Sequence, residues 1–178
     1  MVKPGNSVQL IGLSEVPEVT PGMDLAGIIL DAGRASDLTL RDDDILIVTH
    51  KVVSKAEGRL VDLRDVQPSD LARRFAEQWG KDARQVEVVL RESARIVRMD
   101  RGIIISQTRH GFVCANAGVD ASNVAGEEIV CLLPADPDAS AAALREAFQR
   151  EVGIRPAVII TDSFGRPWRQ GIVNVAIG

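Results

Sequence analysis

The residues best suited to chemistry lie in two short segments, each directly after an apolar run. The first, residues 116–123, reads NAGVDASN and contains one carboxylate, Asp120, with amide and hydroxyl side chains and a glycine. Glycine lets a backbone approach a ligand closely, and these oxygen atoms are hard ligands suited to Mg2+ or Mn2+. An Asx-turn in which Asp120 and Asn123 only fix the loop explains the same residues. Composition alone does not separate the two interpretations.

The second segment, residues 161–169, reads TDSFGRPWR. Asp162 ends an apolar run, where α/β proteins tend to present ligand groups, and Ser163 adds a hydroxyl oxygen. Arg166 and Arg169 follow, and a metal ion beside arginines is an arrangement for phosphoryl transfer. The alternative is a loop in which Asp162 binds local amides and pairs with Arg166. With Asp120, this segment predicts a divalent metal site at which phosphate is handled.

A third signal is the pair Lys51 and Lys55, whose spacing puts both side chains on one face in a helix or in an extended chain. A lysine is a compact charge suited to phosphate, although a solvated basic turn explains the pair as well. The sequence has neither GxxxxGKS/T nor GxGxxG, so it predicts neither a P-loop nor a Rossmann fingerprint. His50 and His110 are expected at turns or on the surface rather than as general bases.

Composition narrows the class of protein. With 178 residues, of which 46% are hydrophobic and 26% charged, the chain is long enough for one domain with a buried core. A net charge of -4 argues against nucleic acid but not against one small anionic ligand. Cys114 and Cys131 lie in apolar runs and are expected as buried free thiols. The N-terminus lacks a signal peptide and no apolar run could span a membrane, so a cytoplasmic location is expected.

Helical and strand patterns are mixed, which predicts an α+β (mixed α/β) fold. Helices are expected from Asp24 to about Gly33, from Ser69 or Asp70 to Gly80, around residues 86–90, and from about Asp138 to Gly153. Strands are expected at residues 8–13, 45–48, 128–133, 157–161 and 172–177, with a β-ribbon between residues 95 and 115. Residues 49–59 are expected to form a polar, basic connection, and residues 128–162 a β-helix-β passage.

Several segments, taken in order, resemble the coenzyme F(420)-0:γ-glutamyl ligase family. They are residues 10–13 (LIGL), 52–59 (VVSKAEGR), 117–123 (AGVDASN), 132–134 (LLP), 136–138 (DPD) and 160–169 (ITDSFGRPWR). Each motif is moderately specific, whereas the ordered set, which covers nearly all of the chain, is far more so.

The resemblance implies an amide-forming ligase in which GTP phosphorylates a carboxylate of coenzyme F(420)-0. The amine of L-glutamate then displaces phosphate, and further glutamates are joined through γ-carboxyls. It also implies a divalent metal, Mg2+ or Mn2+, with a monovalent cation as a further candidate. The implied fold is an unusual α+β ligase fold, with mixed sheets and flanking helices, in an intertwined homodimer.

Site residues carry over by motif. Asp120, Asp162 and Ser163 correspond to metal ligands, and Arg166 joins the two aspartates as a catalytic residue. The nucleotide contacts correspond to Leu13, Ser14, Glu15, Val16, His50, Lys55 and Asn123. His50 is a departure, because members of the family often carry a small hydroxyl residue at this position.

The family pattern continues beyond Gly178. We therefore expect residues 1–178 to be a single ligase domain truncated at its C-terminus, with the remainder adding sheet and nucleotide contacts. The competing hypothesis is a catalytically incomplete module that dimerises and binds a metal or nucleotide.

Overall fold

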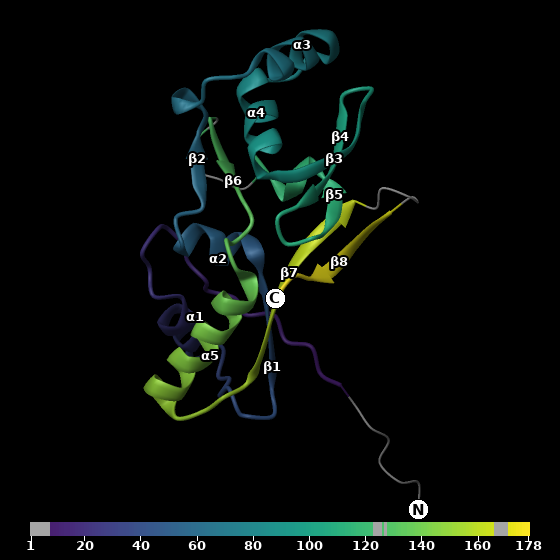
Figure 1. The fold of residues 1–178 in the computed structure, drawn as a ribbon. Helices are drawn as coiled ribbons and strands as arrows, with labels where there is room; N and C mark the ends of the chain where they lie inside the picture. Colours follow the sequence, from purple (N-terminus) through teal and green to yellow (C-terminus); the bar gives the residue numbers. More distant parts are fainter. Residues whose placement is uncertain (1–7, 123–125, 127, 166–170) are drawn as a thin grey trace, which may run out of the picture.

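The computed structural model describes residues 8–122, 126, 128–165 and 171–178 (Figure 1). Within those residues the chain forms five α-helices and eight strands, which confirms the predicted α+β class. The strands form three small sheets rather than one large one. The sheet nearest the two predicted site segments combines parallel and antiparallel pairs, so the expectation of mixed sheets is also confirmed.

The helices are α1 (Leu25–Ala35), α2 (His50–Ala56), α3 (Asp70–Trp79), α4 (Ala83–Glu92) and α5 (Pro137–Val152). The strands are β1 (Ile45–Thr49), β2 (Leu60–Asp62), β3 (Ser93–Asp100), β4 (Ile103–Thr108), β5 (Val113–Ala115), β6 (Ile129–Cys131), β7 (Ala157–Gly165) and β8 (Ile172–Ala176). Two 3-10 turns, η1 (Leu63–Asp65) and η2 (Asn116–Gly118), complete the set.

Three sheets organise these strands. The first has the order β1-β7-β8, with β1 parallel and β8 antiparallel to the central β7. The second pairs β2 with β6, and the third has the order β3-β4-β5. A parallel pair needs a long crossover connection, and the segment between β1 and β7 contains the whole of the other two sheets. The first sheet therefore brings together residues that are far apart in the sequence.

Helix ends follow the sequence signals closely. Ser69 caps α3 by accepting a hydrogen bond from the backbone N–H of Ala72, and Gly80 ends that helix in the left-handed conformation. Asp136 caps α5 in the same way, and Gly153 ends it. The predicted β-ribbon is also present, as the antiparallel strands β3, β4 and β5.

Two expectations about the elements are wrong. The run at residues 8–13 is not a strand; Val8 and Leu10 are 89% and 86% exposed, and among the described residues no strand pairs with the run. Residues 49–59 are mostly helix α2, which packs its Val53 into the core. The expected β-helix-β passage is confirmed as β6, α5 and β7, and its two strands lie in different sheets.

Two clusters of buried side chains form the core. One lies between α1, α2, α5 and the β1-β7-β8 sheet, with Phe148 and Ile160 fully buried at its centre. The other lies between α3, α4, β4 and β6, around Phe75 and Val130. Figure 1 shows them as the lower and upper parts of the molecule, with α2 near the level where they meet. Helix α2 is therefore placed to contact loops from both parts.

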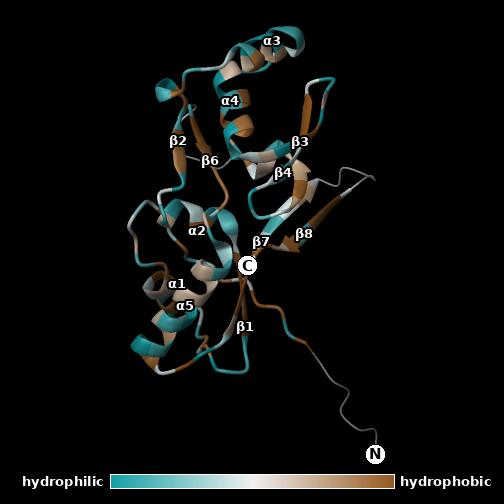
Figure 2. Cartoon of the chain, in the orientation of Figure 1, coloured by the Kyte–Doolittle hydropathy of each residue, from teal (hydrophilic) through white to brown (hydrophobic). Residues whose placement is uncertain are grey.

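Strand β8 is apolar and exposed. Figure 2 shows it in the colour of hydrophobic residues, and Ile172 and Val173 at its start are 75% and 41% exposed. In the part of the chain that the structure describes, no helix is long and apolar enough to cross a membrane.

Candidate functional site

The register of β1 and β7 places the first half of the site. Thr49, the last residue of β1, is the register partner of Thr161. At this point the chain leaves the sheet and enters α2 at His50, while β7 continues through Asp162. The side chains of these next two residues meet, with His50 Nε2 3.1 Å from Asp162 Oδ1. The site therefore lies at the carboxyl end of a parallel strand pair, where α/β proteins commonly bind ligands.

Asp162 is held by its own strand as well. The backbone N–H of Ser163 donates to Asp162 Oδ1 at 2.7 Å, and the Ser163 hydroxyl donates to Asn174 Oδ1 on β8 at 2.7 Å. The Asp162 side chain is only 15% exposed. Burial, and then the negative charge of Asp162, raise the pKa of the Cys114 thiol to about 11. The negative charge of Asp162 therefore influences a buried thiol of the core.

A strained turn brings Asp120 to the site. Asn116, Ala117 and Gly118 have φ values of 53°, 52° and 73°, so three consecutive residues are left-handed. Position 118 requires glycine, because a Cβ there would lie 2.7 Å from Leu133 Cγ. After this turn the backbone N–H and carbonyl of Asp120 both pair with Cys131. Strained backbone of this kind is characteristic of functional sites.

Asp120 binds a helix that is distant in sequence. The Lys51 ammonium on α2 donates to Asp120 Oδ2 at 2.6 Å, and Ser122 donates its backbone N–H to Oδ1 at 2.7 Å. Partial burial raises the pKa of Asp120, but the hydrogen bonds from Lys51 and Ser122 outweigh it and hold that pKa below its ordinary value. An Asx-turn is therefore present at Asp120, with Ser122 as the donor, whereas Asn123, the other residue of the predicted turn, lies outside the described residues. The contact with Lys51 goes beyond what a simple turn requires.

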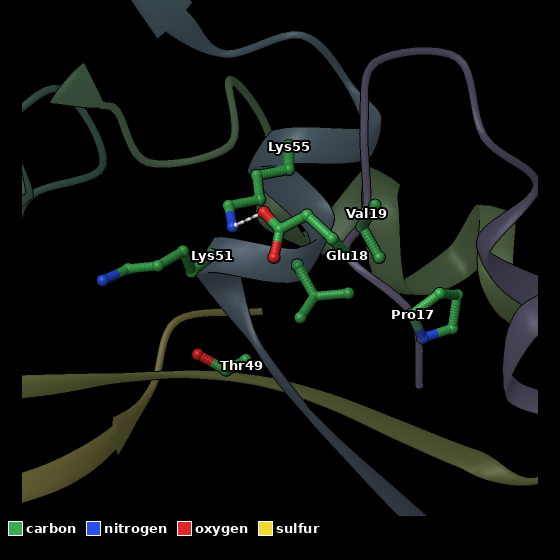
Figure 3. A pocket seen from close by; sticks show the side chains of 7 residues that line it. Pro17, Glu18, Val19, Thr49, Lys51 and Lys55 are labelled. Carbon is green, nitrogen blue, oxygen red and sulfur yellow. Dashed lines mark hydrogen bonds and ion pairs between the residues drawn. The ribbon is translucent and has the colours of Figure 1, made fainter. Parts of the chain in front are cut away.

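Lys51 and Lys55, whose spacing predicted a shared face, both line one cavity. It has a volume of about 260 Å³ and is formed by Pro17, Glu18, Val19, Thr49, Lys51, Val52 and Lys55. Figure 3 shows the two ammonium groups pointing in different directions. Lys55 Nζ donates to Glu18 Oε1 at 2.5 Å, whereas Lys51 points toward the loop of Asp120. The cavity is large enough for part of a nucleotide.

The structure connects some of the predicted site residues through one helix, α2. Helix α2 contacts Asp162 through His50, Asp120 through Lys51 and the segment before α1 through Lys55. Of the predicted nucleotide segment, Leu13 packs against the core and Glu15 has a left-handed φ of 63°. Asn123 and Arg166 lie outside the described residues.

His50 was expected at a turn or on the surface, and that expectation is wrong. Its side chain is buried, with 2% of the residue exposed. His110 does lie in a turn, as expected, and its Nε2 is 2.9 Å from the carbonyl oxygen of Pro134. Glu18 was not predicted as a site residue, because no motif or spacing in the sequence connects it with Lys55.

The donor set suits a hard cation. Two carboxylates and the Ser163 hydroxyl are oxygen ligands of the kind that Mg2+ and Mn2+ use. Among the described residues, no three or more His, Cys, Asp or Glu side chains cluster around one point. A cation held by these residues would take its remaining ligands from water or substrate oxygens, as Mg2+ commonly does in phosphate-transferring proteins. The metal assignment of Asp120, Asp162 and Ser163 stays a prediction.

Helices, mixed sheets and a charged site at the end of a parallel strand pair define an α+β protein. The family model for F(420)-0:gamma-glutamyl ligase matches residues 14–178. The chain belongs to this family.

Curated relatives agree with the family match. The coenzyme F(420):L-glutamate ligase of Methanothermobacter thermautotrophicus is 44% identical over 96% of this chain and 68% of its own length. Those of Methanopyrus kandleri and Methanocaldococcus jannaschii are 50% and 39% identical, over 90% and 100% of this chain. The matches cover 62% and 69% of those two relatives. The chain thus spans about two thirds of the length of these relatives.

Proposed function

We propose that this chain acts in the attachment of L-glutamate to coenzyme F(420)-0, with GTP as the phosphoryl donor. Family membership supports the class of reaction. The structural observation that carries the proposal is the position of α2, whose side chains contact Asp162 on β7, Asp120 on its loop and Glu18 in the cavity. A phosphoryl donor, a divalent cation and an acceptor carboxylate must meet at one place for such a reaction, because positioning and charge stabilisation supply most of the catalysis.

The chemistry assigns a role to each side chain. Transfer of the terminal phosphoryl group of GTP to the acceptor carboxylate concentrates negative charge on the transferred oxygens. Lys55 would exchange Glu18 for a phosphate oxygen, and Lys51 lies one helical turn away. A divalent cation held by Asp120, Asp162 and Ser163 would neutralise charge on the transferring phosphate. The amine of L-glutamate then attacks the acyl phosphate, and phosphate leaves as the amide forms.

Nucleotide binding provides the first test. GTP is titrated into the chain by calorimetry with and without Mn2+, using Asp120→Asn and Asp162→Asn as variants. Asp31→Asn is the control, because Asp31 pairs with Arg34 on an exposed helix face, where its side chain is 75% exposed. We expect metal-dependent binding that is lost in both site variants and kept in the control. Unchanged binding in both site variants would contradict the site.

Product formation provides the second test. The chain is incubated with coenzyme F(420)-0, L-glutamate, GTP and Mn2+, and the product is identified by mass spectrometry. A mass increase of one glutamate, with release of GDP and phosphate, supports the ligase. Metal-dependent GTP binding with no glutamylated product supports the alternative, a binding module without catalysis. Assembly as a homodimer and use of a monovalent cation remain proposals from the family, to be tested by sedimentation and by exchange of K+ for Na+.

A further inference from the structure

His50 has an unusual environment for a residue beside a polar site. Its residue exposure is 2%, and both nitrogens of its ring have a polar neighbour. Nε2 lies 3.1 Å from Asp162 Oδ1, and Nδ1 lies 3.4 Å from the hydroxyl of Ser54, one turn further along α2. Ser54 is itself fully buried. The ring is therefore fixed at both ends by groups that water does not reach freely.

The direction of these hydrogen bonds follows from the chemistry of the partners. An ionised carboxylate only accepts hydrogen bonds, so Nε2 of His50 carries a proton and donates it to Asp162. In a neutral ring with its proton on Nε2, Nδ1 is an acceptor, and the Ser54 hydroxyl 3.4 Å away is a group that can donate to it. This series of hydrogen bonds from Ser54 through His50 to Asp162 specifies one tautomer and one orientation of the His50 ring.

The atom of Asp162 that accepts these hydrogen bonds is Oδ1, and this determines how the carboxylate is oriented. His50 Nε2 and the backbone N–H of Ser163 both act on Oδ1 of Asp162, one from α2 and the other from β7. Two donors on one oxygen fix the plane of the carboxylate, and they direct the second oxygen to whatever ligand the site binds. In metal sites, hydrogen-bond partners behind the ligands orient them in this way.

We propose that His50 is a positioning residue, which orients Asp162 toward a divalent cation and does so without touching the nucleotide through its side chain. This inference rests on the proposed function, because it requires Asp162 to be a metal ligand. It differs from the family-based expectation of a nucleotide contact at this position. The burial of the ring favours the positioning role, since a side chain that is 97% covered has little surface to offer a ligand.

Two amide variants separate this role from a general contribution to packing. The side-chain nitrogen of a glutamine lies about as far from Cα as Nε2 of histidine, whereas that of an asparagine corresponds to Nδ1. His50→Gln therefore keeps a donor for Asp162, and His50→Asn loses it while keeping an amide near Ser54. Mn2+ affinity of the nucleotide-free chain is measured by electron paramagnetic resonance, and unfolding midpoints are measured in urea.

We expect Mn2+ to bind the wild-type chain and the His50→Gln variant within about threefold of each other. His50→Asn should bind Mn2+ about 10- to 100-fold more weakly, the range typical when a partner behind a metal ligand is lost. The two variants should unfold at similar urea concentrations. Equal Mn2+ affinity in the two variants would overturn the inference, as would losses that simply follow their loss of stability.

The same Mn2+ measurements also test the proposed metal site independently of His50. Wild-type binding that Asp162→Asn abolishes supports the metal site whatever the histidine variants do. If the wild-type chain does not bind Mn2+, the metal site and the positioning role are both wrong. Long-range proton-nitrogen NMR spectra of the metal-free chain add a readout of the tautomer. We expect the proton of His50 on Nε2 in the wild type, and a proton on Nδ1 instead would overturn the inference.

Discussion

Lys51 and Asp120 are 69 residues apart in the sequence, yet the lysine ammonium lies 2.6 Å from Asp120 Oδ2. The same ammonium also donates to the backbone carbonyl of Ser122 at 2.9 Å. A single lysine thus fixes both the carboxylate and the backbone of the loop that carries it. It already places positive charge at the carboxylate to which we assign a divalent cation.

The first prediction concerns the protonation of Asp120. In Lys51→Met the hydrogen bond is lost while the partial burial remains, so the pKa of Asp120 should rise above its wild-type value. Folding lowers the pKa of Asp120 in the wild type, so the ionised Asp120 stabilises the folded state. This stabilisation is complete above the unfolded pKa of about 3.9, and it disappears as the pH falls through the lower pKa of the folded state. The stability difference between wild type and Lys51→Met should therefore shrink in acid. Carboxyl carbon NMR measures the pKa, and an unchanged value would contradict the contact.

The second prediction concerns alkaline stability. Burial, and then the charge of Asp162, raise the pKa of Cys114 from 9.0 to about 11. The neutral thiol is thus favoured in the folded state, and its contribution is complete below pH 9 and lost as the pH rises toward 11. Two pKa units correspond to about 3 kcal/mol. Urea unfolding of wild type and Cys114→Ala should show the wild type losing more stability between these values, whereas parallel pH profiles would contradict the raised pKa.

The third prediction concerns the turn before Asp120. Gly118→Ala should lower the free energy of unfolding by about 2 to 4 kcal/mol, because it adds a clash with Leu133 to the strain of a left-handed residue. The control is Gly80→Ala, which has a φ of 62° and open space around the added Cβ. It should cost about 1 kcal/mol, from backbone strain alone. Equal losses in urea unfolding would show that Leu133 moves aside at no cost.

The fourth prediction concerns Glu18, which pairs with Lys55 in the cavity. Its carboxylate competes with a phosphate oxygen for the same ammonium, so Glu18→Gln should tighten GTP binding by up to about fivefold, the value of an exposed ion pair. Lys55→Gln should weaken it. Glu146→Gln makes the same change of charge on the exposed face of α5 and is the control. Weaker GTP binding in Glu18→Gln, measured by calorimetry, would indicate that Glu18 itself holds the ligand or its metal.

Local signals in the sequence were sufficient for most helices. Ser69 and Gly80 mark the ends of α3 because a capping hydroxyl and a left-handed glycine act within one turn. The apolar run at residues 8–13 was wrongly predicted as a strand. Its pattern suits a strand, but among the described residues no strand lies beside it to pair with. Helix α2 was missed because it is only seven residues long, makes no side-chain hydrogen bond at its N-cap residue Thr49, and is stabilised by packing of Val53.

The two aspartates could be recognised from residue types near strand ends, whereas their partners could not. The contact of His50 with Asp162 depends on the register of β1 against β7, which is a tertiary property. The contact of Lys51 with Asp120 depends in addition on a left-handed turn that includes Ala117, a residue that seldom adopts this conformation. No local pattern specifies either distance.

The parallel pairing of β1 with β7 also determines when the site can form. In the sheet order β1-β7-β8, the one strand among the described residues that pairs with residues 45–49 is that at residues 157–161. The chain between them must close a long loop before that pairing contributes any stability. His50 can therefore reach Asp162 only late in folding, after the helices and hairpins between the two strands have had time to form. We expect refolding to recover helical structure first and binding of the metal last.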